Sequence, residues 1–101
     1  MARIQVLFFS GCPHAIATVD LVRRAAFACG LPDAVESIRI DTPAEAVQHR
    51  FIGSPTVRVD GVDIEPAARQ RSKYSLACRL YGTSGVPASE LIVNAIRDSR
   101  T

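Results

Sequence analysis

The sequence has 101 residues, 48% of them hydrophobic and 22% charged, a balance typical of one soluble globular domain spanning residues 1–101. Its formal net charge of +2 is too small to indicate a nucleic-acid partner, and no run of like charges indicates binding to a membrane surface. The apolar stretches are too short to span a bilayer and the N-terminus lacks a secretory-signal pattern, so we expect a cytoplasmic location.

The first part of the chain predicts a buried strand followed by an amphipathic helix. Residues 3–10 are almost continuously apolar, as in a strand that is buried on both faces. Pro13 is suited to the first position of the helix, and Gly30 is suited to its end. The expected inward face of this helix is the apolar series Ile16, Val19, Val22, Ala26 and Cys29.

Three further elements follow in the middle of the chain. Residues 35–40 predict a second strand, and the capping-box sequence at residues 42–45 predicts a short helix to about Arg50. Residues 57–64 alternate in polarity around the pair Asp60-Gly61, which favours a tight type I′ turn. The sequence therefore predicts a β-hairpin after the short helix.

The last part of the chain predicts a polar loop and a C-terminal helix. The loop covers residues 66–75 and carries the basic residues Arg69, Arg71 and Lys73. Residues 76–81 fit either a short strand or a helical turn. After Pro87 a helix is expected, with an inward face of Leu91, Ile92, Ala95 and Ile96.

The predicted order is βαβα, then a β-hairpin, then a helix. The alternating half requires parallel strands joined by a crossover, whereas the hairpin adds antiparallel strands. We therefore expect an α/β fold in which a mixed sheet has helices on both faces.

Two short motifs in this order resemble the thioredoxin superfamily. The segment Gly11-Cys12-Pro13-His14-Ala15 lies between the first strand and its helix, where that family carries its active-site cysteine. Ser54-Pro55-Thr56 lies just before the hairpin, where the family has a cis-proline beside that cysteine. The resemblance implies a thioredoxin-like fold and a substrate groove formed by Pro13, Ser54, Pro55 and Thr56, in which the Ser54 backbone pairs with an extended substrate.

The active-site motif departs from the family at its fourth position. Cys-Pro-His resembles the motif of bacterial disulfide-forming oxidases, and Cys-Pro is also similar to glutaredoxins, but Ala15 stands where the second cysteine belongs. The chain is also similar to small bacterial thioredoxin-like proteins, some of them described as alkylmercury-lyase-like. The departure leaves open which thiol, if any, acts as partner to Cys12.

Cys12 is the expected nucleophile on physical grounds as well. A thiol at the N-terminus of a helix faces unpaired N–H groups and the positive end of the helix dipole, and both favour the thiolate. A protonated His14 would act in the same direction. The alternative is that Cys12 is incidental on a fold that serves binding.

The other two cysteines differ as candidates for the resolving thiol. Cys29 follows Cys12 by 17 residues, about 25 Å along a helix, whereas a disulfide requires Cα atoms within about 7 Å, so we expect an inert core residue. Cys78 precedes Arg79 and follows a basic loop, so its surroundings are either electropositive or, if the segment is a short apolar strand, buried. Either Cys78 or an external low-molecular-weight thiol would then resolve the mixed disulfide.

The sequence as a whole predicts a thiol–disulfide oxidoreductase that acts on a protein or small-thiol disulfide and is re-reduced by a partner reductase or a small thiol. No organic cofactor is expected, and without Cys-x-x-Cys or His-x-x-x-His spacing no stable metal site is expected either. A non-catalytic thioredoxin-fold binding module is the main alternative. A lesser one is soft-metal or organomercurial chemistry at the thiolates of Cys12 and Cys78; His14 would add a third ligand only to a stable metal site, which is not expected.

Overall fold

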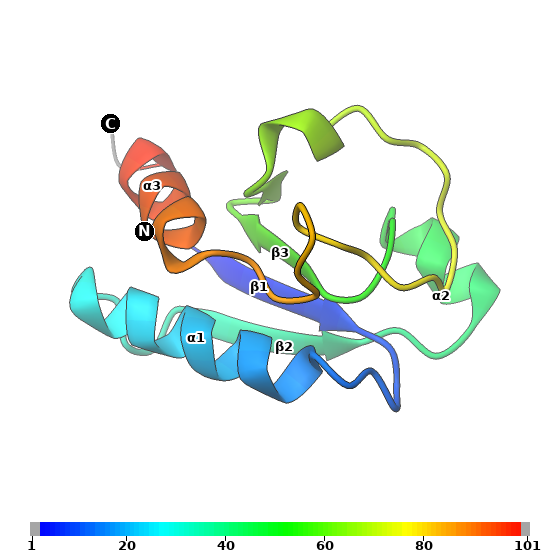
Figure 1. Cartoon of the computed structure of the whole chain (residues 1–101), viewed down its shortest axis with the longest axis horizontal. Coiled ribbons are helices and arrows are strands. Elements are labelled where there is room, and N and C mark those ends of the chain that lie inside the picture. The colour runs from blue at the N-terminus through cyan, green and yellow to red at the C-terminus, as the bar shows by residue number, and fades with distance from the viewer. Residues whose placement is uncertain (1–2, 100–101) are drawn as a thin grey trace.

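The computed structural model describes residues 3–99 as a four-stranded mixed sheet with helices packed against it (Figure 1). Along the chain the elements are β1 (Ile4–Phe8), α1 (Ala15–Ala28), β2 (Val35–Arg39), α2 (Pro43–Gln48), β3 (Thr56–Val59), β4 (Val62–Asp63), the 3₁₀ helix η1 (Pro66–Ala68) and α3 (Ser89–Ser99). The expected α/β class and element order are confirmed. None of the described helices is long and apolar enough to cross a lipid bilayer.

The strands lie in the order β2-β1-β3-β4. β1 is parallel to β2, with Ile4 opposite Val35, and antiparallel to β3, with Ile4 opposite Val59. β3 and β4 form the antiparallel hairpin. The central position of β1 explains its nearly continuous apolar sequence, because both of its faces are covered.

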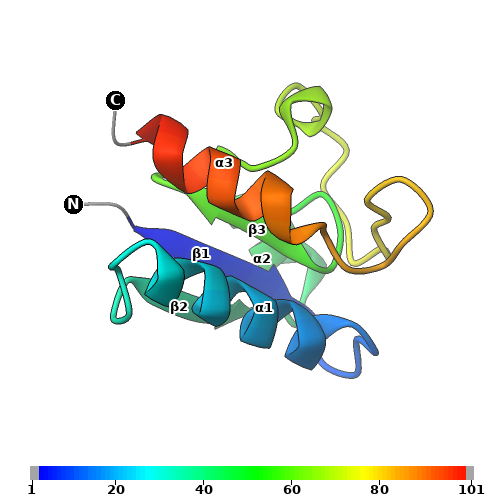
Figure 2. The ribbon, with the colours of Figure 1, turned by 60° about the vertical axis from the view of Figure 1, so that its left-hand side comes forward.

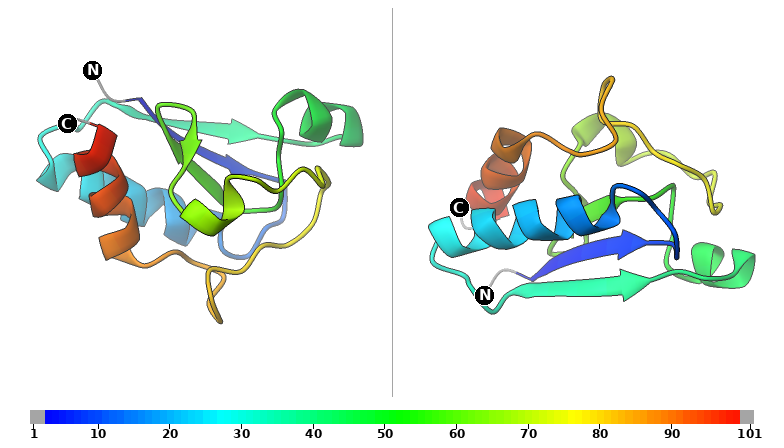
Figure 3. Two further views of the ribbon diagram at one scale, coloured as in Figure 1. Left: turned by 90° about the horizontal axis from the view of Figure 1, so that it is seen from above. Right: turned by 60° about the horizontal axis from the view of Figure 1, so that its bottom comes forward.

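α1 and α3 lie side by side on one face of the sheet (Figures 2 and 3). The main hydrophobic core lies between these helices and the sheet, and its fully buried members include Ile4, Val6, Val22, Val57, Ile92 and Ile96. A smaller core lies on the opposite face, where Ala46 of α2 and the following Phe51 cover Leu7 and Ile40. The expected coverage of both faces is thus met at one end of the sheet by the short α2.

Two local sequence signals fold as predicted. Asp60 and Gly61 have φ values of +52° and +81°, the positive values that a type I′ hairpin turn requires. Thr42 caps α2, because its hydroxyl accepts a hydrogen bond of 3.1 Å from the backbone N–H of Glu45. After α2 the chain enters β3, which pairs antiparallel with β1, and the Asp60-Gly61 turn then leads into β4.

Two expectations for α1 are wrong. Pro13 does not open the helix, which begins at Ala15. Ile16 is 86% exposed, and the buried face is instead Ala15, Thr18, Val22, Ala25 and Ala26. The apolar residues of α1 form a wide stripe, and hydrophobicity alone favoured Ile16, whereas in the first turn the side chain facing the sheet is the smaller Ala15. Cys29 is half-buried against the main core, as its place on the stripe suggested.

Candidate functional site

The loop that carries Cys12 meets the cis-proline turn where β1 ends. The backbone N–H of Cys12 donates to the carbonyl of Phe9 over 3.2 Å. The N–H of Phe9 in turn donates to Oγ of Ser54 over 3.4 Å. The Ser54–Pro55 peptide bond is cis, as the resemblance implied. Phe9 therefore joins two motifs that are more than forty residues apart in the sequence.

Residues 77–79 pair with the same turn from its other side. The N–H of Ser54 donates to the carbonyl of Ala77 over 2.8 Å, and the N–H of Arg79 donates to the carbonyl of Ser54 over 3.0 Å. These bonds form an isolated parallel β-bridge between Ser54 and Cys78. Cys78 thus lies beside the cis-proline turn, in a single bridge rather than the strand or helical turn left open for residues 76–81.

The expectation that the Ser54 backbone is free for an extended substrate is wrong. Its N–H and its carbonyl are both bonded to residues 77–79 of this chain. Ser54 is 2% exposed, Pro55 is buried and Thr56 is 0% exposed, so these three expected groove residues are covered. Pro13, the fourth, is exposed beside Cys12.

Cys12 itself lies in the turn that leads into α1 rather than in its first turn. The first helical N–H, that of Ala15, donates over 3.3 Å to the carbonyl of Cys12. The backbone of Cys12 therefore takes up one of the N–H groups that were expected to face its thiol. Gly11 has φ +85°, which permits the tight turn here, and the Cys12 side chain is half-buried.

His14 packs against the loop that precedes α3. Its imidazole fills the space that a Cβ atom on Gly85 would occupy, so the ring lies against the Gly85 backbone. His14 is the N-terminal cap residue of α1 by position, but its side chain makes no capping hydrogen bond. The contact with Gly85 ties the Cys12 turn to the segment that follows Cys78.

The expected electropositive surroundings of Cys78 are not provided by its neighbour Arg79. Cys78 is exposed, whereas Arg79 is only 3% exposed and points into the protein. Its guanidinium makes a two-pronged ion pair with Asp63, with distances of 2.7 and 2.8 Å, and a third contact of 3.2 Å with Glu65. The charge of Arg79 is therefore balanced in the interior, away from the exposed thiol.

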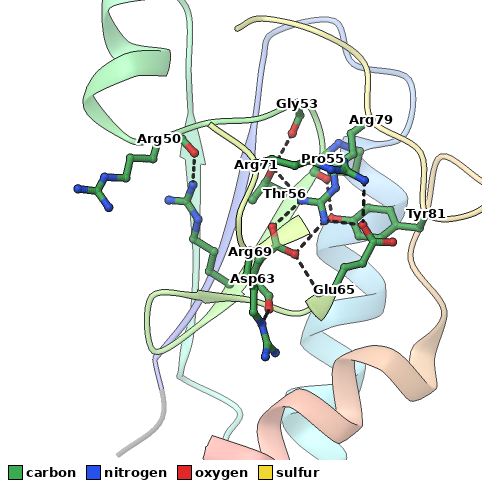
Figure 4. A network of polar contacts seen from close by, with 11 residues as sticks. Arg50, Gly53, Pro55, Thr56, Asp63, Glu65, Arg69, Arg71, Arg79 and Tyr81 are labelled. Carbon is green, nitrogen blue, oxygen red and sulfur yellow. Dashed lines mark hydrogen bonds and ion pairs between the residues drawn. The ribbon is translucent and has the colours of Figure 1, made fainter. Parts of the chain in front are cut away.

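The residues around Arg79 form a polar cluster that we call the Arg79 cluster, comprising the buried Thr56, Asp63, Arg79 and Tyr81 and the partly exposed Glu65 (Figure 4). The Tyr81 hydroxyl donates to the carbonyl of Pro55 over 2.7 Å, and the guanidinium of Arg79 lies 4.3 Å from the centre of the Tyr81 ring. The Thr56 hydroxyl donates to the carbonyl of Gly53 over 2.6 Å and accepts from Arg79 over 3.2 Å. The cluster thus holds the carbonyls on both sides of the cis-proline turn.

Burial and charge shift two pKa values in the Arg79 cluster. Burial raises the pKa of Tyr81 well above its usual range, although the positive charge of Arg79 opposes this shift. For Arg79 burial acts to lower the pKa, but the hydrogen bond to Asp63, with help from Tyr81 and Glu65, outweighs burial and raises it. Tyr81 is therefore neutral and Arg79 charged across the ordinary pH range.

Sequence patterns could not have identified the Arg79 cluster. Asp63 is the last residue of a two-residue strand, Arg79 stands in a loop, and they are 16 positions apart. Only the hairpin and the returning chain bring them together, and the sequence offered Arg79 as a neighbour of Cys78, not as a partner of Asp63. The alternation of polarity along residues 57–64 groups Asp63 with the polar positions of the hairpin, whereas Asp63 is only 8% exposed in the structure.

Cys12, His14 and Cys78 are the three side chains that could supply ligands if this part of the chain held a metal ion. Within residues 3–99, no group of three His, Cys, Asp or Glu side chains is placed to hold a metal ion. Cys12, His14 and Cys78 therefore do not form one coordination site in this structure, although all three belong to segments that meet at the cis-proline turn.

Comparison of the sequence with models of protein families and with curated proteins finds no match. Any functional conclusion therefore depends on the geometry of the Cys12 turn, the cis-proline turn and the Cys78 segment.

Proposed function

We propose that this protein is a thiol–disulfide oxidoreductase of the thioredoxin type, in which Cys12 is the nucleophile and Cys78 the resolving thiol. The strand order β2-β1-β3-β4, with parallel and antiparallel neighbours of β1, supports that fold. The hydrogen bond from the N–H of Phe9 to Oγ of Ser54, which joins the Cys12 turn to the Pro55 turn, supports it further.

The observation that carries the proposal is the path of hydrogen bonds that joins the two cysteine segments. It runs from Cys12 to Phe9, from Phe9 to Ser54, and from Ser54 to the residues on either side of Cys78. Cys12 and Cys78 are 66 positions apart in the sequence, yet both segments are attached to one turn. This arrangement would let Cys78 take the role of the cysteine that is missing at Ala15.

The proposed reaction is a two-step thiol–disulfide exchange. The Cys12 thiolate attacks one sulfur of a substrate disulfide, and the other sulfur leaves as a thiolate. The Cys78 thiolate then attacks the Cys12 sulfur of the mixed disulfide and releases the second half of the substrate. The substrate gains two electrons, the protein is left with a Cys12–Cys78 disulfide, and an external dithiol or two small thiols restore the reduced form.

We infer that the preferred substrate is a small disulfide rather than an extended peptide. A peptide that adds to the sheet beside Pro55 would need the N–H and carbonyl of Ser54, and residues 77–79 already bond to both. Cys78 is exposed and Cys12 half-buried, so a compact molecule has less of the chain to displace. A protein substrate would require the 77–79 segment to move first.

Exchange kinetics with three single variants test the proposal. Reduction of glutathione disulfide should fall to the background rate in Cys12→Ser. In Cys78→Ser the first half-reaction should persist and stop at a stable mixed disulfide on Cys12. Cys29→Ser is the matched control and should retain the full rate, because Cys29 lies at the other end of α1.

The same experiment discriminates the alternative of a binding module without catalysis. The start of α1 at Ala15 favours that alternative, because it moves the helix terminus away from the Cys12 thiol. If the wild-type protein reacts with the disulfide no faster than an unstructured peptide containing Cys12, the proposal is wrong and Cys12 is incidental.

A further inference from the structure

A pocket of about 300 Å³ lies between the β3–β4 hairpin, the turn at Arg50 and the loop after η1. Neither Cys12 nor Cys78 lines it, so it is separate from the cysteine site. Its polar lining is formed by Arg50, Arg58, Asp63, Arg69, Arg71 and Tyr74. The pocket concentrates positive charge, because four arginines line it although the net charge of the whole chain is only +2.

The positive charge of the pocket is not balanced by acidic residues in its lining. Asp63 is the one carboxylate among the residues that line it, and both of its oxygens already accept hydrogen bonds from the guanidinium of Arg79. Glu65 pairs with Arg79 at 3.2 Å and reaches Arg71 only at 3.7 Å. The lining arginines therefore remain largely uncompensated.

The arginines also have more N–H donors than the protein supplies acceptors. A guanidinium group has five N–H donors. Within residues 3–99, Arg58 donates to one acceptor, the carbonyl of Arg50 at 2.7 Å, and Arg69 to one, the carbonyl of Asp63 at 2.8 Å (Figure 4). Two main-chain oxygens leave most of these donors available, and a bound oxyanion would accept from them.

The environment of Arg58 shows the same imbalance. Its side chain is half-buried beside the pocket. Burial lowers the pKa of Arg58, and the neighbouring charges of Arg79 and Arg50 lower it further, although Asp63 acts in the opposite direction. A negative ligand in the pocket would relieve this destabilisation of the Arg58 charge.

We propose that this pocket binds a small ligand that carries at least two negative charges on phosphate or carboxylate oxygens. Guanidinium groups bind both kinds of oxyanion through paired N–H donors, and several of them favour a ligand with several charges. The volume of about 300 Å³ is at the small end of ligand sites, which fits a compact ligand rather than a segment of a macromolecule. The Tyr74 ring in the lining offers a flat surface for the uncharged part of such a ligand.

Calorimetric titration of the whole protein with pyrophosphate, and separately with citrate, tests this proposal. We expect saturable binding of at least one probe at one site per chain, and the tighter probe identifies phosphate or carboxylate as the preferred group. Arg58→Gln and Arg69→Gln should each weaken the tighter probe about tenfold or more. Arg97→Gln, which removes the same charge from the exposed end of α3, should change binding less than about twofold.

The variants also identify the outcomes that would overturn the proposal. If neither probe binds saturably, or if Arg97→Gln weakens binding as much as Arg58→Gln does, the pocket is not a site and general surface charge explains any association. Binding that tightens steadily with polyphosphate length and resists both pocket substitutions would likewise contradict it. Should Arg58→Gln fail to fold, judged by circular dichroism, Arg69→Gln and Arg71→Gln carry the same comparison, because both residues lie in the loop after η1.

Discussion

The two sides of the cis-proline turn are held by different kinds of interaction. On the side of residues 77–81, a buried ion pair, a tyrosine hydroxyl and two backbone hydrogen bonds fix the chain. On the side of the Cys12 turn, the contacts are main-chain bonds at Phe9 and Ala15, the bond from Phe9 to Ser54, and the packing of an exposed histidine on Gly85.

This difference separates the residues that stabilise the site from the one that would react. The Arg79 cluster pairs the charges of Asp63 and Arg79 in the interior, where both residues are almost fully buried, so these residues are costly to change. The Cys12 turn has few side-chain bonds, so substitutions there should affect chemistry more than folding. The predictions below test that separation, beginning with the largest effect.

The largest effect on stability is expected from Asp63→Ala. This change leaves Arg79 buried without its main partner, and breaking a buried ion pair from one side costs about 3–5 kcal/mol of unfolding free energy. Asp41→Ala is the matched control, because the Asp41–Arg39 pair is largely exposed and should contribute less than about 1 kcal/mol. Urea unfolding of both variants measures the difference, and equal losses would show that the Arg79 cluster does not stabilise the turn.

Two glycine-to-alanine changes compare the two sides directly. A Cβ atom at Gly53, where φ is +147°, would lie 2.9 Å from Cβ of Arg79 and 3.3 Å from the carbonyl of Ala77, so Gly53→Ala should cost about 1–3 kcal/mol. A Cβ atom at Gly85 would meet the His14 ring, which is an exposed side chain that can rotate away, so Gly85→Ala should cost less than about 1 kcal/mol. If urea unfolding shows a larger loss of unfolding free energy for Gly85→Ala than for Gly53→Ala, the expected difference between the two sides is wrong.

A smaller effect concerns stability at alkaline pH. Because the folded protein raises the pKa of Tyr81, the neutral hydroxyl stabilises the fold fully below about pH 10, the ordinary tyrosine value, and this contribution is lost as the pH rises above it. Tyr81→Phe should lower stability at pH 7 by about 1 kcal/mol, through loss of the bond to Pro55, and should flatten the decline between pH 9 and about 11. Thermal unfolding of Tyr81→Phe and of the wild type across this pH range measures the difference, and an equally steep decline in both proteins would contradict the prediction.

The fold was more predictable than the site, because different physical signals govern them. The continuous apolar run of β1, the capping box before α2 and the Asp60-Gly61 turn are local patterns, and each formed as expected. The cis-proline was expected from a motif.

The interactions that surround the site are not local. The pairing of residues 77–79 with Ser54 and the ion pair of Arg79 with Asp63 depend on how the chain returns after the hairpin. Arg79 points into the protein, so it does not provide the electropositive surroundings expected for Cys78. The Ser54 backbone is already hydrogen-bonded to residues 77–79, so a small disulfide replaces the extended peptide as the proposed substrate. Periodicity and composition contain no signal for either result, because both are contacts between residues far apart in the sequence.

The most direct test of the central claim is the disulfide that the protein forms when it is oxidised. After mild diamide treatment and blocking of remaining thiols, trypsin separates the three cysteines, because Cys12, Cys29 and Cys78 fall in the peptides 4–23, 25–39 and 74–79, respectively. We predict that mass spectrometry finds peptides 4–23 and 74–79 joined, with 25–39 blocked as a thiol. Cys12 found only as a blocked thiol or as an adduct with an added thiol, never linked to Cys78 of the same chain, would contradict the account.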